Sequence, residues 1–118
     1  MPANYSLRVL IIEDDALVAL DLEAIFTRLG HRVVQIAATE NDAVSAARTH
    51  APDLMTVDIR LREGTGTAAV SRILAERPVP HLYVTGSPVE LLDRNAVLVP
   101  KPFSRRTLLA AVERALAS

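Results

Sequence analysis

An apolar run that ends in three acids, Leu7-Arg8-Val9-Leu10-Ile11-Ile12-Glu13-Asp14-Asp15, gives the first indication of the architecture. The run is rich in β-branched and aliphatic residues and too short for a typical helix, which favours a buried strand. Similar short runs recur along the chain, and together they predict five strands, at Leu7–Ile12, Arg32–Ile36, Leu54–Val57, Leu82–Thr85 and Ala96–Val99.

Segments with the apolar spacing of helices lie between and after these strands. Gly30 is predicted to end the first helix in a left-handed conformation, Thr39 or Asn41 to cap the second, and Ser104 to cap the last. Continuous apolar strands that alternate with amphipathic helices predict a doubly wound α/β fold, a mainly parallel sheet covered on both faces. The apolar positions are Val18, Leu22, Ile25 and Leu29; Ala43, Ala46 and Ala47; Ala69, Val70, Ile73 and Leu74; and Leu108, Leu109, Val112 and Leu116.

The interval between Thr85 and Leu98 is short for a crossover helix. It also contains Gly86 and Pro88, which interrupt regular structure. We expect a shortened or irregular fourth helix there, over Val89–Arg94.

The overall composition limits the classes of protein to which this chain can belong. The 118 residues, half of them hydrophobic, fit one domain over 1–118 without an effector domain. The absence of cysteine excludes disulfides and thiol chemistry and agrees with a cytoplasmic location. A net charge of −1 gives no broad attraction for nucleic acid, and neither a signal peptide nor a membrane span is apparent.

Chemically active residues follow the predicted strands. Ligand sites in open parallel sheets lie beyond the carboxyl ends of the strands. The first strand ends at Glu13-Asp14-Asp15, the third at Asp58, the fourth at Thr85-Gly86 and the fifth at Lys101-Pro102-Phe103. These groups are therefore expected on one rim of the sheet.

Clustered carboxylates repel one another unless a cation compensates. An all-oxygen ligand set without histidine or cysteine suits Mg²⁺, which also keeps waters and a phosphate oxygen. Lys101 would supply a point charge for a phosphate and Thr85 a hydroxyl donor. Asp58, beside the metal, can act as a nucleophile that forms an acyl phosphate.

In this order and at these strand ends, Glu13-Asp14, Asp58, Thr85-Gly86 and Lys101-Pro102-Phe103 resemble the receiver domain of response regulators. The resemblance covers essentially the whole chain. It implies a flavodoxin-like five-stranded parallel sheet in the order 2-1-3-4-5. It also implies that output comes through protein contact, or that the protein is a phosphate shuttle or sink.

The same resemblance assigns the residues their roles. Asp58 would accept a phosphoryl group from a sensor histidine kinase or histidine phosphotransfer protein and lose it by self-catalysed hydrolysis. Asp14 would bind Mg²⁺ directly, Glu13 through water, and Asp58 and the backbone carbonyl of Arg60 would complete the ligands. Asp15 would cap the first helix, and the Lys101-Pro102 bond would be cis. A monomer or weak homodimer is expected.

The sequence departs from the common receiver pattern at two places. Leu98 stands where receivers usually have a switch Tyr or Phe, so the usual coupling of an aromatic ring to the Thr85 hydroxyl cannot operate. The segment Tyr83–Pro88, with the proline-free loop that follows Asp58, is similar to the alphaproteobacterial subfamily called FAT GUY, although Tyr83, Val84 and Pro88 differ from its pattern.

Alternatives stay open. An acidic tripeptide alone is typical of a helix N-terminus, and only the joint occurrence of four elements favours a site. A pseudo-receiver would keep the fold as an interaction module without phosphorylation. A haloacid-dehalogenase-type phosphatase would need an Asp-x-Asp pattern after the first strand, which Glu13-Asp14-Asp15 lacks. The scattered residues His31, His50 and His81 predict no metal site.

Overall fold

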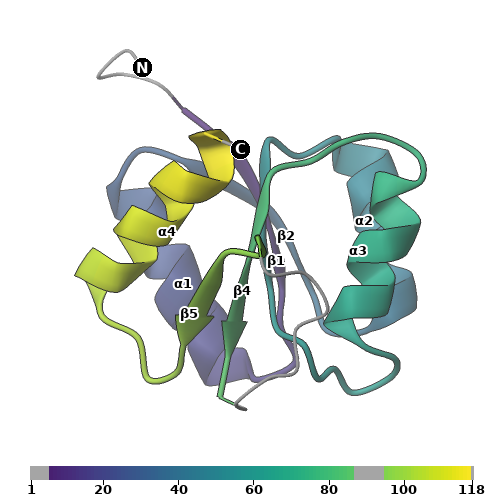
Figure 1. Ribbon diagram of the computed structural model, residues 1–118, viewed down its shortest axis with the longest axis horizontal. Coiled ribbons are helices and arrows are strands. Elements are labelled where there is room, and N and C mark those ends of the chain that lie inside the picture. The colour runs from purple at the N-terminus through teal and green to yellow at the C-terminus, as the bar shows by residue number, and fades with distance from the viewer. Residues whose placement is uncertain (1–5, 87–94, 118) are drawn as a thin grey trace.

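The computed structural model describes residues 6–86 and 95–117, which form a layered α/β structure around one sheet (Figure 1). All strand pairs are parallel, in the order β2-β1-β3-β4-β5, as the resemblance implied. The strands are β1 (Arg8–Ile12), β2 (Arg32–Ala37), β3 (Leu54–Val57), β4 (His81–Thr85) and β5 (Leu98–Pro100). The helices in the described part are α1 (Ala16–Arg28), α2 (Glu40–His50), α3 (Gly66–Leu74) and α4 (Arg105–Ala117).

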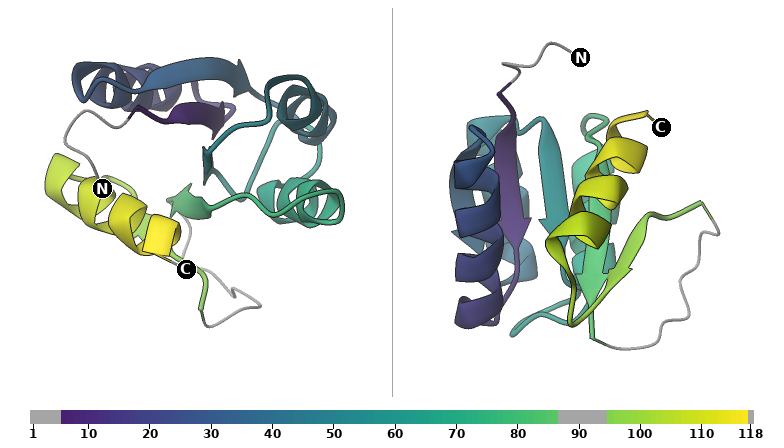
Figure 2. Two further views of the ribbon diagram at one scale, coloured as in Figure 1. Left: turned by 90° about the horizontal axis from the view of Figure 1, so that it is seen from above. Right: turned by 90° about the vertical axis from the view of Figure 1, so that its left-hand side faces the viewer.

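The helices cover the sheet in pairs. Seen from above, α1 and α4 lie on one face and α2 and α3 on the other (Figure 2). Strand β1 is buried on both sides, with Val9 and Ile11 in the core under α1 and α4, and Leu10 and Ile12 in the core under α2 and α3. A central strand of a doubly covered parallel sheet has no polar face, which explains its continuous apolar sequence.

The predicted helix ends are confirmed. The Asp15 side chain accepts hydrogen bonds from the N–H groups of Leu17 and Val18 and caps α1. Thr39 caps α2, and Gly30 adopts φ +88° after α1. The Ser104 hydroxyl accepts a hydrogen bond from the Thr107 N–H at 3.1 Å at the start of α4.

The edge strand β5 differs from the prediction, because it begins at Leu98 rather than Ala96. The carbonyl of Val97 already accepts a hydrogen bond from the Tyr83 N–H at 2.8 Å, so the pairing starts just before the regular strand. Pro100, which lacks an N–H, ends the strand, and proline is tolerated at a sheet edge.

The irregular helix expected over Val89–Arg94 lies outside the described residues. Helix α4 of the structure corresponds to the last helix expected from the sequence. Within residues 6–86 and 95–117, no helix has the length and apolar character that a membrane crossing requires.

Candidate functional site

Backbone hydrogen bonds fix two acids at the carboxyl ends of β1 and β3. The N–H of Glu13 donates to the carbonyl of Ala37 at 2.9 Å, and the N–H of Asp58 donates to the carbonyl of Ile12 at 2.8 Å. Both acids are buried, with 2% of Glu13 and 7% of Asp58 exposed. The sheet ladder therefore continues into the acids and places them on adjacent strands.

Asp14, which is exposed, completes a cluster of three carboxylates. One oxygen each from Glu13, Asp14 and Asp58 lies within 4.8 Å of the others. The Asp15 side chain caps α1 instead, while its N–H donates to Glu13 Oε2 at 3.1 Å. Three of the four acids predicted on this rim thus converge, and the fourth supports a helix, as expected.

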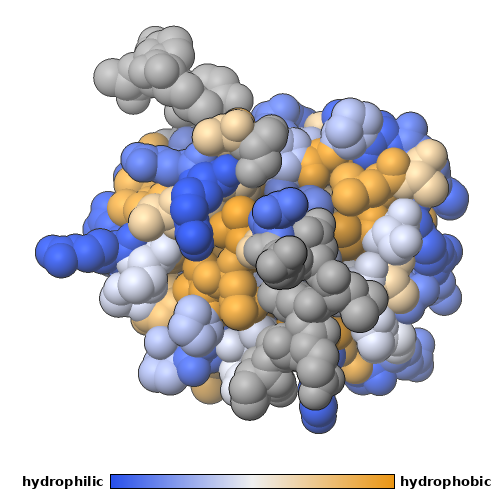
Figure 3. Space-filling model, viewed as in Figure 1, coloured by the Kyte–Doolittle hydropathy of each residue, from blue (hydrophilic) through white to orange (hydrophobic). Residues whose placement is uncertain are grey.

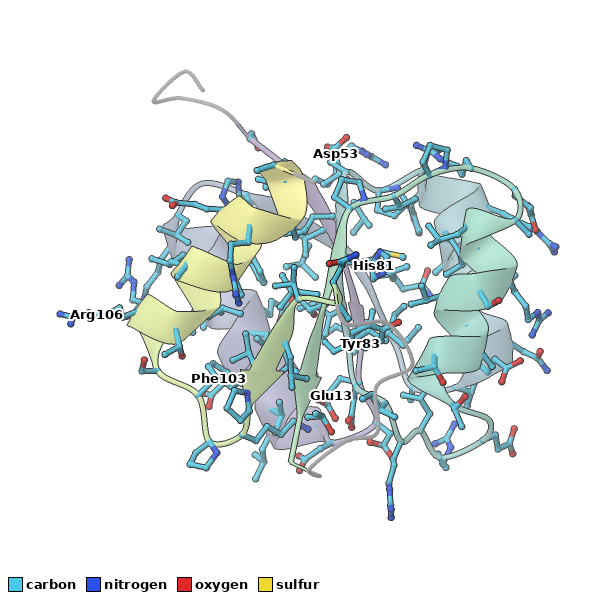
Figure 4. The ribbon with its side chains drawn as sticks, viewed as in Figure 1. Glu13, Asp53, His81, Tyr83, Phe103 and Arg106 are labelled. Atoms are coloured by element: carbon cyan, nitrogen blue, oxygen red, sulfur yellow. The ribbon has the colours of Figure 1, made fainter. Side chains whose placement is uncertain are left out.

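Lys101 reaches into this cluster from the end of β5. Its Nζ lies 2.9 Å from Glu13 Oε1 and 3.4 Å from Asp58 Oδ2. The Lys101 N–H donates to the carbonyl of Thr85 at 2.8 Å, which joins the ends of β4 and β5. Thr85 is buried, and the Lys101-Pro102 bond is cis, as the resemblance implied. Phe103 packs against the core under α1 and α4 and anchors this segment (Figure 4).

The ammonium of Lys101 does not fully compensate the negative charge of the clustered carboxylates. Burial raises the pKa of Glu13 to about 7, although Lys101 and the Asp15 N–H oppose the shift, and the carboxylate of Asp58 adds to it. Burial alone would lower the pKa of Lys101, but Glu13 and Asp58 outweigh this effect and raise it.

The Glu13–Lys101 contact has the distance of an ion pair without the alignment of a hydrogen bond, so the buried Glu13 Oε1 has no hydrogen bond within the described residues. A hard divalent cation fits such a set of oxygen donors.

The loop after β3 contains the remaining predicted ligand, Arg60. This residue is exposed and pairs with Thr65 in an antiparallel bridge, beside a hydrogen bond from the Gly66 N–H to the Ile59 carbonyl at 2.7 Å. A Cβ at Gly66 would collide with the backbone of Asp58, so glycine is needed for this approach. Gly66 was not singled out from the sequence, although the Gly64-Thr65-Gly66 spacing was a visible signal.

Other polar groups and hollows lie away from the acids. Asp53 precedes β3 and lies at the end of the sheet opposite Glu13 (Figure 4). Hydrophobic residues gather over β5 and along α3 (Figure 3). A hollow between α3, β4 and the residues just before β5 is lined by residues such as Val70, Leu74 and Tyr83, and its described lining contains no acidic side chain. It is therefore separate from the acidic cluster.

The family model described as "Response regulator receiver domain" matches residues 9–113. This chain belongs to the response-regulator receiver family. The receiver thus has a role in two-component signalling, and the matched range includes every acid of the cluster and Lys101.

Relatives of the receiver agree with the predicted subfamily. The phyllosphere-induced regulator PhyR of Methylorubrum extorquens is 36% identical over 98% of this chain and 46% of its own length. The solution structure of the Erythrobacter litoralis PhyR receiver domain has a TM-score of 0.88 at 36% identity, covering 98% of this chain and 94% of that one.

The crystal structure of the anti-anti-sigma factor PhyR from Bartonella quintana has a TM-score of 0.83 at 36% identity, covering 96% of this chain and 48% of that chain. The receiver thus spans about half the length of the longer relatives. The PhyR matches confirm the predicted alphaproteobacterial type, and the haloacid-dehalogenase alternative is not supported.

Proposed function

We propose that the receiver takes a phosphoryl group onto Asp58 from a phosphohistidine of a sensor histidine kinase or histidine phosphotransfer protein. The observation behind this proposal is the pairing of a buried Asp58 carboxylate with Lys101 Nζ at 3.4 Å, inside a cluster of three acids. The donors are those that the family's role in two-component signalling suggests. We place the exchange in the cytoplasm, with the receiver as a monomer or weak homodimer.

The transfer balances as an in-line displacement. An oxygen of the Asp58 carboxylate attacks phosphorus, the P–N bond to the donor imidazole breaks, and that nitrogen recovers its electron pair. The product is an acyl phosphate. In the later hydrolysis, water attacks phosphorus, the bond to the Asp58 oxygen breaks, and the free carboxylate and inorganic phosphate are formed.

Lys101 and Thr85 would bind the transferred group. The Lys101 ammonium already lies between two carboxylates, so it can pair with a phosphoryl oxygen by a small rotation of its side chain. The Thr85 hydroxyl belongs to the residue whose carbonyl holds the Lys101 N–H, so the two donors are positioned together.

The residues fit Mg²⁺, because their carboxylates are clustered and one buried oxygen lacks a hydrogen bond in the described structure. Asp14, Asp58 and the carbonyl of Arg60 would hold the ion directly, and Glu13 through water. When bound, Mg²⁺ supplies positive charge beside the phosphoryl oxygens.

The output of the receiver would depend on the same groups. With a phosphoryl group on Asp58, Lys101 and Thr85 gain an anionic partner, and the surface around the ends of β4 and β5 changes. We propose that this surface contacts an output protein, as the name anti-anti-sigma factor suggests for a relative. Passing the phosphate to another protein, as a shuttle or sink, would use the same acceptor.

Two aspartates that flank β3 provide a matched test. Incubation with acetyl phosphate and Mg²⁺ should add one phosphoryl group to the wild-type receiver by intact mass, and Asp58→Asn should abolish it. Asp53→Asn is the control, because Asp53 lies at the other end of the strand and an amide oxygen can still accept the Arg8 N–H. Labelling of Asp58→Asn would refute the acceptor. A folded wild type that takes no label under these conditions would favour the interaction module instead.

A further inference from the structure

The loop between β3 and α3 determines where two groups of the site lie. It begins with Asp58 and contains the backbone carbonyl of Arg60, so its path fixes the distance between an acceptor and a predicted Mg²⁺ ligand. Its ends are held by β3 and by Thr65, whose hydroxyl accepts the Ala68 N–H at 3.1 Å and caps α3. The middle of the loop needs support from elsewhere in the molecule.

The first residue of α2, Glu40, supplies this support. Its N–H donates to the carbonyl of Glu63 at 2.9 Å, and its Oε1 accepts a hydrogen bond from the Thr65 N–H at 3.3 Å. Its Oε2 lies 3.0 Å from Arg72 of α3, which also donates to Asn41 at 2.9 Å. One side chain thus links α2, the loop and α3, and only 22% of it is exposed.

Gly64 shows how closely Glu40 packs on the loop. The residue adopts φ +80°, and a Cβ at this position would collide with the Glu40 side chain. The loop backbone therefore passes directly over the carboxylate, at a residue that has no side chain to prevent it. Two residues far apart in sequence are matched to each other, and neither belongs to the cluster of acids.

We propose that Glu40 is a positioning residue for Mg²⁺ binding at the acidic cluster. It holds the loop so that the Asp58 carboxylate and the Arg60 carbonyl keep their relative positions. Mg²⁺ demands near-ideal octahedral geometry, so a small displacement of one ligand weakens binding. The inference rests on the proposed function, because it assumes that the cluster binds the ion.

A second ion pair, between α2 and the turn after α3, provides the control. Arg48 Nη2 of α2 lies 2.7 Å from Oε2 of Glu76, which stands in the turn after α3, and neither residue belongs to the loop. Glu40→Ala and Glu76→Ala each remove a carboxylate that pairs with an arginine, the Glu76 pair being the more exposed, and only the first removes the support of the loop. Glu40→Gln keeps an oxygen that can accept the Thr65 N–H while it removes the charge opposite Arg72.

The direct measurement is a Mg²⁺ titration by calorimetry without phosphodonor, with thermal unfolding as the check on folding. We expect Glu40→Ala to weaken Mg²⁺ binding about tenfold. This loss is at the low end of the range seen when a residue that supports a metal ligand, without binding the metal itself, is removed. Glu76→Ala should bind as the wild type does, and Glu40→Gln should retain most of the affinity, within about threefold.

The outcomes separate this inference from the proposed function. A wild-type receiver that binds no Mg²⁺ would count against the proposed function. Wild-type affinity in Glu40→Ala would overturn the positioning role, as would equal losses in Glu40→Ala and Glu76→Ala. Should Glu40→Ala fail to fold, Glu40→Gln decides: near wild-type affinity supports the hydrogen bond to the loop, and a tenfold or larger loss, on the order expected for an outer-shell partner, refutes it.

Discussion

The two ends of the sheet use polar residues in opposite ways. At the amino end, the N–H of Arg8 donates to Asp53 Oδ2 at 2.8 Å, the N–H of Leu7 donates to His31 Nδ1 at 3.0 Å, and the Arg8 guanidinium donates to the carbonyl of His50 at 2.8 Å. At the carboxyl end, two of three clustered carboxylates share one ammonium, and Glu13 Oε1 is buried without a hydrogen bond within the described residues.

The contrast separates stability from function in a single sheet. Partnered polar groups at the amino end contribute to folding, because each of these partly buried donors has its acceptor. Crowded acids at the carboxyl end cost stability, and such cost is typical of sites that must bind a charged ligand. Substitutions at the two ends should therefore have opposite effects on the free energy of unfolding.

The largest effect is expected at the amino end. Asp53→Ala removes the acceptor of the Arg8 N–H and should lower the free energy of unfolding by about 2 kcal/mol, since a partly buried donor loses a charged partner. Chemical denaturation measures the change. Phosphorylation from acetyl phosphate should be unchanged in the folded protein, and a loss of labelling would contradict the division between the two ends.

Much of this division could be predicted from the sequence. Apolar runs that end in acids, a hydroxyl or a lysine placed Glu13, Asp58 and Lys101 on one rim, because parallel strands share a direction. The partners of Asp53 and His31 could not be predicted, since they depend on the register between strands. Glu40 was likewise missed. Its partner Arg72 is 32 positions away, and no local pattern connects them.

Asp58→Asn is expected to raise the free energy of unfolding, whereas Asp53→Ala lowers it. In the absence of Mg²⁺, the change removes one of three clustered charges while Lys101 keeps its ion pair with Glu13. We expect the free energy of unfolding to rise by about 1 kcal/mol, as at other sites where function costs stability. Denaturation with and without saturating Mg²⁺ measures this gain, which should shrink or reverse when the ion compensates the wild-type charges. A variant less stable than the wild type without Mg²⁺ would show that the acids are not in conflict.

The smallest effect concerns the pH dependence of the amino end. Burial lowers the pKa of His31 below its ordinary value of 6.5, and its Nδ1 can accept the Leu7 N–H only while unprotonated. The unfolded chain takes up a proton near pH 6.5 and the folded chain does not, so this contribution is present above pH 6.5 and is lost as the pH falls below it.

Urea denaturation at pH 7.5 and pH 5.5, values about one unit either side of the ordinary histidine pKa, should show the wild type losing more stability on acidification than His31→Leu loses. His50 and His81 are common to both proteins and cancel in the difference. An equal loss in both proteins would mean that the hydrogen bond from Leu7 does not depend on the protonation of His31.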